Sequence, residues 1–314
     1  MRAAAILGLG TSPRDLRVFQ ERSAAEWTLG LPAGPDQADA ILVFGGDGTV
    51  HRNLNALVRL DLPVLVVPAG SGNDFARALG LLKLRDSLAA WRAFEAGKGR
   101  VRSVELGCIT PLACSSHSYF ACVAGVGLDA DIARRANTMP RWLRRTGGYA
   151  LSLPSSLFSL RPFQARIFTP TGAPTTASDP SSTRLSTAAH NDLPSRVDEP
   201  AALVAFANAP FYGGGMKIAP DARLDDGALD VCLIRDMDKF KLFCLFPTVY
   251  FGGHLSVKEV KYFQTEQARV ETDPPRDIYA DGEPVGKTPA QFSVARSVLR
   301  VIVKLAAQDP EPGA

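Results

Sequence analysis

The feature that most constrains the fold is a glycine-rich turn that directly follows a short apolar run. The turn Gly45-Gly46-Asp47-Gly48-Thr49 lies between residues 41–44, an apolar run, and a stretch whose apolar residues have helical spacing. Such a turn is typical of an open α/β sheet, which binds ligands at the carboxyl ends of its strands. The glycines expose backbone N–H groups that favour an anion, whereas Asp47 repels phosphate unless a cation stands between them. The turn therefore indicates a nucleotide with Mg²⁺; the alternative is a tight turn that needs glycine for positive φ.

A second turn of the same kind follows the next apolar run, residues 63–67. It reads Pro68-Ala69-Gly70-Ser71-Gly72-Asn73-Asp74 and precedes another helical stretch. Because neighbouring parallel strands end at the same edge of a sheet, we expect both turns to face one crevice. Ser71 and Asn73 add neutral donors suited to phosphate or ribose oxygens. Asp74 is also suited to cap the helix that follows.

The first third of the chain alternates two patterns that together indicate βαβ units. Short apolar runs are typical of strands buried on both faces of a parallel sheet, and stretches with helical spacing separate them. The apolar runs lie at residues 3–7, 40–44 and 63–67, and the helical stretches at residues 50–60, 74–81 and 86–96. We therefore expect a parallel sheet in an α/β fold, with both glycine-rich turns at strand ends.

After about residue 104 the pattern changes to strands and long loops without regular intervening helices. This pattern predicts a mostly antiparallel β lobe. Its expected strands lie at residues 119–126, 163–168, 201–207, 228–233, 268–271 and 298–305. We divide the chain into a nucleotide-binding α/β domain at residues 1–105, a β-rich second domain at residues 106–307 and a tail at residues 308–314. Residues 170–200 are rich in Pro, Ser, Thr, Asp and Ala, which predicts a mobile insertion.

Length and composition exclude several classes of protein. The 314 residues suit two lobes, since single cores stop growing at about 250 to 300 residues. No apolar run reaches the roughly 20 residues that span a bilayer, and the start of the chain reads as a strand instead of a signal peptide. We expect a cytoplasmic protein. The net charge of +3 is too small to indicate nucleic acid, and the histidines and cysteines lack the spacing of zinc ligands.

Several motifs in one order resemble the diacylglycerol kinase catalytic family, which includes bacterial lipid kinases, sphingosine kinases and ceramide kinases and is distantly related to NAD kinases. They are G-G-D-G-T-V at 45–50, P-A-G-S-G-N-D-F-A-R-A-L-G at 68–80, Y-F-A-C-V-A-G-V-G-L-D-A at 119–130, G-G-G-M-K-I-A-P-D-A-R-L-D-D-G-A-L-D at 213–230 and D-G-E-P at 281–284. The resemblance implies a Rossmann-like nucleotide-binding lobe and a mostly antiparallel β-sandwich lobe that binds lipid. It also implies transfer of phosphate from ATP, with Mg²⁺, to a hydroxyl of a diacylglycerol-like or sphingoid lipid.

The resemblance further implies roles for individual residues. Asp47 is the implied Mg²⁺ ligand or general base, and Glu283 matches the general base of bacterial lipid kinases; from local sequence alone, Glu283 is a turn residue. Asp74 resembles a member of a charge network that supports the nucleotide site, and Asp129 lies at a position near the lipid head group or is a structural acid. The residues implied in the ATP phosphate cradle are Gly45, Gly46, Gly48, Thr49, Gly70, Ser71, Gly72 and Asn73.

Two charged clusters extend these expectations. Asp221, Asp225 and Asp226 are acidic enough for a second, structural Mg²⁺ site, or form a solvated turn capped by Asp side chains. Basic residues surround Trp142 and Leu143, a mixture suited to an anionic leaflet or to a solvated arginine face. These are Arg134, Arg135, Arg141, Arg144 and Arg145. We therefore expect peripheral contact with the inner membrane leaflet, where the lipid substrate lies, and leave a homodimer open.

Three departures from the family pattern motivate alternatives. Residues 8–13 replace the Asn-Pro and glycine-containing loop that usually opens the family. Only about 30 residues separate this loop from Gly45, so we expect one helix to be lost and residues 27–31 to survive as a short strand. Arg52 stands where the family often has an acid, and it either contacts phosphate or marks a changed metal site. The alternatives to a lipid kinase are a lipid- or nucleotide-binding protein without turnover and an NAD kinase.

Overall fold

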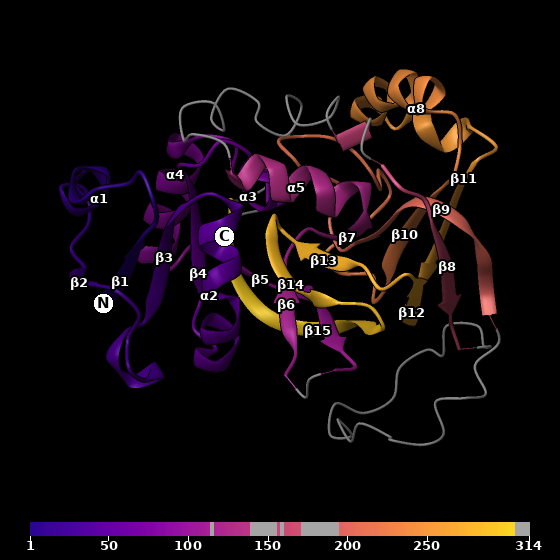
Figure 1. Cartoon of the computed structure of the whole chain (residues 1–314). Helices are drawn as coiled ribbons and strands as arrows, with labels where there is room; N and C mark the ends of the chain where they lie inside the picture. Colours follow the sequence, from indigo (N-terminus) through magenta and orange to yellow (C-terminus); the bar gives the residue numbers. More distant parts are fainter. Residues whose placement is uncertain (114–115, 139–155, 158–159, 171–194, 305–314) are drawn as a thin grey trace, which may run out of the picture.

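The computed structural model describes residues 1–113, 116–138, 156–157, 160–170 and 195–304, which form two lobes (Figure 1). The first lobe holds a parallel sheet in the order β4-β3-β1-β2. Its strands are β1 (Arg2–Leu7), β2 (Glu26–Leu29), β3 (Ala40–Gly45) and β4 (Val64–Pro68). The helices of this lobe are α1 (Pro13–Gln20), α2 (Asp47–Leu60), α3 (Asp74–Ala78) and α4 (Leu84–Glu95). The predicted βαβ arrangement is therefore present.

The expected loss of one helix falls between β2 and β3. A single 3-10 turn, η1 (Pro35–Gln37), connects these strands, whereas α1 is retained between β1 and β2. The short strand predicted at residues 27–31 is β2, which begins one residue earlier. The shortened connection explains why so few residues separate β1 from the first glycine-rich turn.

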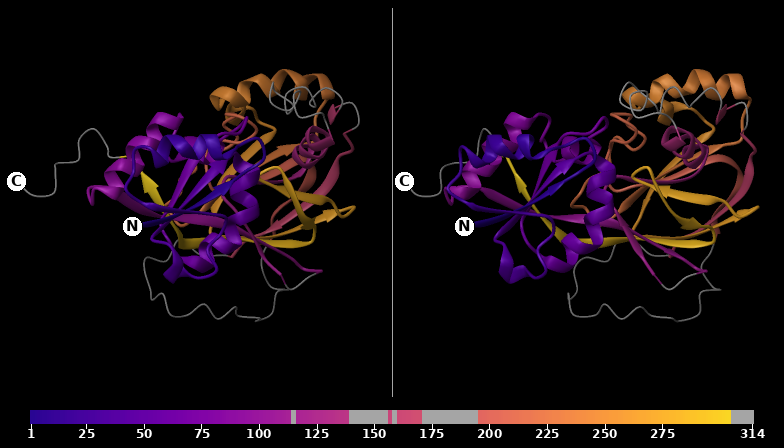
Figure 2. Two further views of the ribbon diagram at one scale, coloured as in Figure 1. Left: turned by 90° about the vertical axis from the view of Figure 1, so that its left-hand side faces the viewer. Right: turned by 60° about the vertical axis from the view of Figure 1, so that its left-hand side comes forward.

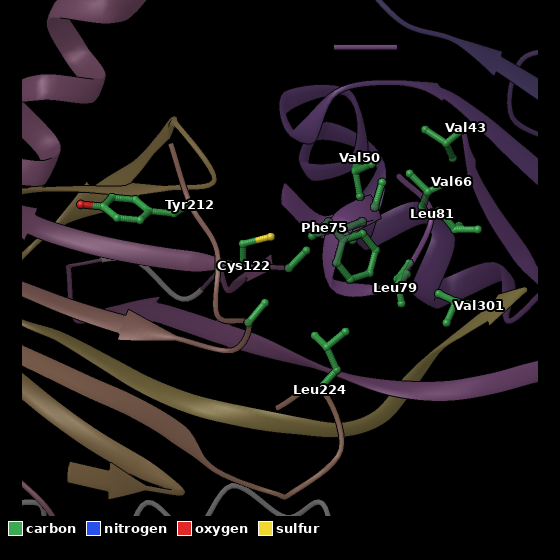
Figure 3. Packing of buried hydrophobic residues seen from close by; sticks show 14 of the residues in the cluster. Val43, Val50, Val66, Phe75, Leu79, Leu81, Cys122, Tyr212, Leu224 and Val301 are labelled. Atoms are coloured by element: carbon green, nitrogen blue, oxygen red, sulfur yellow. The ribbon is translucent and has the colours of Figure 1, made fainter. Parts of the chain in front are cut away.

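The core of the first lobe explains why these elements form. Every residue of β3 is buried, as expected for a strand covered on both faces. Helix α2 buries one stripe at three-to-four spacing, which includes Val50, Leu54 and Leu57. Figure 3 shows Val50 and Phe75 packing near the buried residues of β3 and β4. This packing fixes the start of α2 and the start of α3 at the same edge of the sheet.

The second lobe is mostly antiparallel β-structure. Its strands are β5 (Arg100–Pro111), β6 (Ser118–Phe120), β7 (Val123–Gly127), β8 (Phe163–Phe168), β9 (Ser195–Ala207), β10 (Leu229–Arg235), β11 (Val260–Thr265), β12 (Gln267–Asp273), β13 (Asp277–Ala280), β14 (Glu283–Lys287) and β15 (Ala290–Val303). The second core lies among them, with the rings of Phe206 and Phe292 stacked at 4.1 Å. The prediction of an antiparallel β lobe is confirmed.

The expectation that this lobe lacks regular helices is wrong. Helix α5 (Leu128–Thr138) follows β7, and α8 (Lys239–Leu245) continues into the 3-10 helices η2 (Phe246–Phe251) and η3 (Gly253–Ser256). Among the described residues, no helix is long and apolar enough to cross a bilayer.

Two long strands connect the lobes. β5 and β15 pair from Pro111 and Ala290 in the second lobe to Arg100 and Val303 in the first, where β15 also pairs with β4 (Figure 2). The predicted boundary at residue 105 lies inside β5. Most of the predicted insertion and the whole predicted tail lie outside the described residues, whereas residues 195–200 belong to β9.

Candidate active site

The two glycine-rich turns lie in direct contact. A Cβ atom added to Gly46 would lie 2.9 Å from the Cα atom of Gly70, and a Cβ added to Gly70 would overlap Gly46. No side chain fits at either position, so the backbones of the two turns approach as closely as glycine allows. The two turns therefore lie side by side at the carboxyl ends of β3 and β4, as predicted.

Of the other residues predicted for the phosphate cradle, some stabilise the turns and one faces solvent. The Asn73 side chain closes the second turn, because its Oδ1 accepts from Gly70 N and its Nδ2 donates to Gly70 O, both at 2.8 Å. Thr49 is 7% exposed and packs between Gly8 and Gly45. Ser71 is exposed. Asn73 and Thr49 thus shape the turns, while Ser71 is exposed at their surface.

Asp47 and Asp74 meet beside Gly72. A Cβ atom added to Gly72 would lie 2.8 Å from Asp47 Oδ2 and 3.4 Å from Asp74 Oδ2. Asp47 Oδ1 accepts a hydrogen bond from Phe75 N at 3.0 Å. Burial raises the pKa of Asp47 above its ordinary value, against the lowering effect of backbone hydrogen bonds.

Asp74 is the more deeply buried of the two carboxylates. It is 3% exposed, and its Oδ2 accepts from Gly214 N at 2.8 Å. Its Oδ1 has no hydrogen-bond partner, and the nearest cation is Arg77, with Nε at 3.8 Å. Burial, and then the nearby charge of Asp47, raise the pKa of Asp74 to about 7.

The loop at residues 213–215 of the second lobe contacts Asp74 in the first lobe. All three glycines have positive φ, with 92° at Gly214, a backbone conformation that L side chains rarely adopt. This conformation directs Gly214 N at the Asp74 carboxylate, across 140 positions of sequence. The G-G-G motif therefore contributes a donor to the charge network that the resemblance implies for Asp74.

Asp281 and His51 form a contact that the sequence analysis missed. Asp281 lies in the turn between β13 and β14 with φ 49°, and its side chain is 1% exposed. Its carboxylate accepts from Ala121 N at 2.7 Å and Cys122 N at 2.9 Å, and His51 Nδ1 lies 3.2 Å away. These contacts fasten the β13–β14 hairpin to β7 and to α2. The only sequence signal was the Asp-Gly pair of D-G-E-P.

Glu283 extends from that hairpin to the beginning of α2. Its Oε1 lies 2.7 Å from Arg52 Nη1, and a Cβ atom added to Gly48 would lie 3.0 Å from the same oxygen. The Glu283 side chain is 31% exposed. Glu283 therefore reaches from the second lobe to Gly48 in the first glycine-rich turn, and Arg52 pairs with it.

Models of two protein families match the chain. Residues 15–109 match the diacylglycerol kinase catalytic domain, and residues 122–303 match the YegS C-terminal NAD kinase beta sandwich-like domain. A diacylglycerol kinase of Mycobacterium tuberculosis is 31% identical over 264 residues, which cover 84% of this chain and 76% of that protein. The chain belongs to the diacylglycerol kinase family. The resemblance found in the sequence is thereby confirmed.

Solved structures support the fold. A diacylglycerol kinase of Bacillus anthracis aligns with a TM-score of 0.64 at 17% identity, covering 96% of this chain and 97% of that chain. An NAD kinase of Archaeoglobus fulgidus in complex with ATP aligns with a TM-score of 0.51 at 14% identity, covering 98% and 95%. The diacylglycerol kinase family fold, an α/β lobe with a β-sandwich-like second lobe, was predicted correctly.

The metal site that the family resemblance implies at Asp47 and the second site suggested by the acidic cluster at residues 221–226 differ in how well their residues fit a cation. At Asp47 and Asp74, a half-buried and a buried carboxylate with raised pKa values and an unpartnered Asp74 Oδ1 fit a divalent cation. Asp225 instead pairs with Arg102 at 2.7 Å and Arg223 at 3.3 Å. Within the described ranges, no three Asp, Glu, His or Cys side chains are grouped as metal ligands.

The remaining predicted site residues of this diacylglycerol kinase family member lie away from the glycine-rich turns in the sequence. Asp226 Oδ1 accepts from Ala228 N at 3.2 Å, which matches the alternative of a capped turn, and Asp221 is exposed. Asp129 lies in the first turn of α5, and its side chain is outside the described part of the chain. Of the arginine cluster, Arg134 and Arg135 lie on α5, and Arg141, Trp142, Leu143, Arg144 and Arg145 lie outside the described residues.

Proposed function

We propose that the protein transfers phosphate from ATP, with Mg²⁺, to a hydroxyl group of a diacylglycerol-like or sphingoid lipid. The observation that carries this proposal is the position of Glu283, from the second lobe, beside Gly48 in the turn that also holds Asp47. A kinase that acts on an alcohol needs a base at the acceptor and charge stabilisation at the phosphates, and carboxylates on facing lobes divide these tasks. Relatives named diacylglycerol kinase and sphingosine kinase 1 support the lipid acceptors.

The two turns form the phosphate-binding part of the proposed site. Backbone N–H groups at the beginning of α2 favour an anion, and the contact between Gly46 and Gly70 lets a ligand approach the backbone closely. Asp47 and Asp74 would hold a Mg²⁺ ion, and a cation there would neutralise charge that grows on the leaving phosphates. The ATP complex of the related NAD kinase structure supports nucleotide use by this fold.

Glu283 is the proposed general base. Arg52 Nη1 engages Glu283 Oε1, which leaves Oε2 to accept the proton of the attacking hydroxyl. Arg52 fixes the direction of the carboxylate and brings a guanidinium close to the position of phosphate transfer, where positive charge stabilises the transferring group. The Asp281 carboxylate accepts hydrogen bonds from Ala121 N and Cys122 N, which fastens the β13–β14 turn to the chain just before β7. Glu283 follows this turn directly, so its backbone is held in place.

The second candidate is a lipid- or nucleotide-binding protein of the same fold without turnover. The observation that favours it is the ion pair between Arg52 and Glu283, at a position where the family often has an acid. An NAD kinase is the enzymatic alternative. We propose that the lipid is reached by peripheral contact with the inner leaflet of the membrane.

One assay separates these functions. Radiolabelled ATP is incubated with the purified full chain, Mg²⁺ and, in separate reactions, diacylglycerol, sphingosine, ceramide or NAD⁺, with Glu283→Gln as the matched control. We expect a labelled lipid product that the variant does not form. Labelled NADP⁺ would identify an NAD kinase, and ATP binding without transfer to any acceptor would favour the binding protein.

A further inference from the structure

The second lobe contains a buried histidine, His254, that no part of the proposed mechanism uses. It lies in η3 and is fully buried. Its Nε2 lies 3.0 Å from the carbonyl oxygen of Ile218, whereas its Nδ1 has no hydrogen-bond partner among the described residues. A carbonyl oxygen can only accept, so Nε2 carries the proton and donates. The side chain therefore provides one donor, at Nε2, and leaves a buried lone pair at Nδ1.

The charge state of His254 agrees with this assignment. Burial lowers the pKa of His254 below its ordinary value, against the raising effect of the hydrogen bond to Ile218 O. The imidazole is therefore neutral at pH 7 and has a single N–H. A buried acceptor without a partner is destabilising, so packing alone does not account for a histidine at this position. The hydrogen bond to Ile218 O accounts for it.

Ile218 lies at the base of the loop that reaches Asp74. Tyr212 and Met216 exchange two backbone hydrogen bonds, of 2.9 and 3.0 Å, which enclose the three glycines at residues 213–215. These bonds fix the shape of the loop. Met216 and Ile218 are buried, while the glycines at the tip supply the N–H group that Asp74 accepts at 2.8 Å. The loop therefore connects the interior of the second lobe to the candidate active site.

Two hydrogen bonds from η2 and η3 fix where this loop lies. Lys217 N donates to Val249 O at 3.0 Å, and His254 donates to Ile218 O. The first bond joins backbone atoms, whereas the second depends on the identity of one side chain. Loss of the Nε2 donor would leave Ile218 O unsatisfied in a buried position, which movement of the loop would relieve. Such a movement displaces the Gly214 N–H.

The Gly214 N–H is placed to orient Asp74 toward a cation. Hydrogen bonds to a carboxylate ligand orient it on a metal, and loss of such a partner weakens metal affinity by about 10- to 100-fold. Asp74 Oδ2 accepts from Gly214 N, which leaves Oδ1, without a hydrogen-bond partner in the described part of the chain, for the cation. The position of the loop therefore determines which oxygen of Asp74 is available.

We propose that His254 is a positioning residue for phosphate transfer, because its Nε2–H holds Ile218 O and thereby keeps Gly214 N directed at Asp74. His254 acts through residues 213–218 on the cation site. The proposal rests on the proposed kinase function for the role of Asp74, and it is tested by measurements that do not require turnover.

Three substitutions separate the Nε2 donor from the rest of the side chain. The amide nitrogen of His254→Gln is as many bonds from the backbone as Nε2, so it can donate to Ile218 O. The amide nitrogen of His254→Asn stands at the position of Nδ1 and is too short to replace this donor. His254→Leu fills the site without a donor. If the leucine variant fails to fold, the comparison of glutamine with asparagine carries the test.

The first measurement is amide hydrogen exchange of the metal-free protein, followed by mass spectrometry. Peptides that cover residues 212–218 should exchange about tenfold faster in His254→Asn than in wild type, and within about twofold of wild type in His254→Gln. Strand β10 is the internal reference, because a general loss of stability accelerates its exchange as well. Faster exchange confined to the loop shows that His254 anchors it.

The second measurement is Mg²⁺ affinity, taken from the Mg²⁺ dependence of the unfolding midpoint. We expect His254→Asn to bind Mg²⁺ about tenfold more weakly than wild type, and His254→Gln to stay within about threefold. The Mg²⁺ concentration for half-maximal phosphate transfer should shift by the same factors. A histidine with a purely structural role would change stability and leave the Mg²⁺ affinity unchanged.

Three results overturn the proposal. These are unchanged exchange of residues 212–218 in His254→Asn, equal Mg²⁺ affinity in His254→Asn and wild type, and equal losses in His254→Asn and His254→Gln. A wild-type chain that binds Mg²⁺ and phosphorylates no lipid would refute the proposed function, while exchange and Mg²⁺ affinity would still decide whether His254 acts on Asp74. Absence of Mg²⁺ binding to wild type would refute both.

Discussion

Replacing Asp74 by asparagine should make the metal-free protein more stable at pH 8. The amide has the shape of the carboxyl group, and its oxygen can still accept from Gly214 N. The substitution removes a buried charge whose Oδ1 has no partner and whose neighbour is the Asp47 carboxylate. We therefore expect the Asp74 carboxylate to lower the free energy of unfolding of the metal-free protein.

The magnitude follows from the pKa of Asp74. Its rise from the ordinary 3.8 to about 7 in the folded protein corresponds to about 4 kcal/mol, since one pKa unit is worth about 1.4 kcal/mol. Between these two pH values the folded state binds more protons than the unfolded state, so the free energy of unfolding falls as pH rises. The penalty is absent below pH 4 and complete above pH 7. Asp47 acts in the same direction, and comparison of wild type with the variant isolates Asp74.

The assay is urea unfolding of wild type and Asp74→Asn at pH 4, 6 and 8 in EDTA, repeated with Mg²⁺. We expect nearly equal stability at pH 4 and an advantage of about 2 to 4 kcal/mol for the variant at pH 8. Mg²⁺ should stabilise wild type more than the variant, because the cation compensates the buried charges. A variant that is less stable than wild type at pH 8 in EDTA would refute this reasoning.

Three further substitutions test other parts of the site. Asp47→Asn should keep the fold, as judged by circular dichroism, and lower turnover by about three orders of magnitude, because a metal-linked charge is lost; turnover within tenfold of wild type would contradict this role. Glu283→Gln should bind ATP normally in calorimetry and lose about 10² to 10⁴ in transfer, and normal transfer would remove Glu283 from the mechanism. Asp281→Ala leaves buried N–H groups of residues 121–123 without their acceptor and should lower the free energy of unfolding by about 3 to 5 kcal/mol; a thermal midpoint equal to that of wild type would show that these bonds contribute little.

The first lobe could be predicted from the sequence because its signals are local. β3 is a continuous apolar run that is buried on both faces, and the glycine-rich turn after it specifies both a strand end and a helix start. The closeness of the two turns followed from the rule that parallel strands end at one edge of a sheet. For the second lobe, the pattern of short strands predicted only antiparallel β-structure. The family resemblance added the prediction of a β-sandwich.

The contacts between the lobes could not be predicted in the same way. Arg52 and Glu283 are 231 positions apart, and His51 and Asp281 are 230 positions apart, so no local pattern relates them. Helix α8 was missed because it is short and its exposed positions hold both lysines and aromatic residues, which blurs the alternation of polar and apolar residues by which a surface helix is recognised.

The long strand β15 has a consequence for the order in which the protein is assembled during synthesis. It pairs with β5 along its length and with β4 at the edge of the first lobe, yet every other described strand leaves the ribosome before it. The sheet of the nascent first lobe therefore keeps an open edge at β4 until nearly the whole chain has emerged. An open strand edge is a site for pairing with other chains, so interrupted translation before residue 290 should release products prone to aggregation.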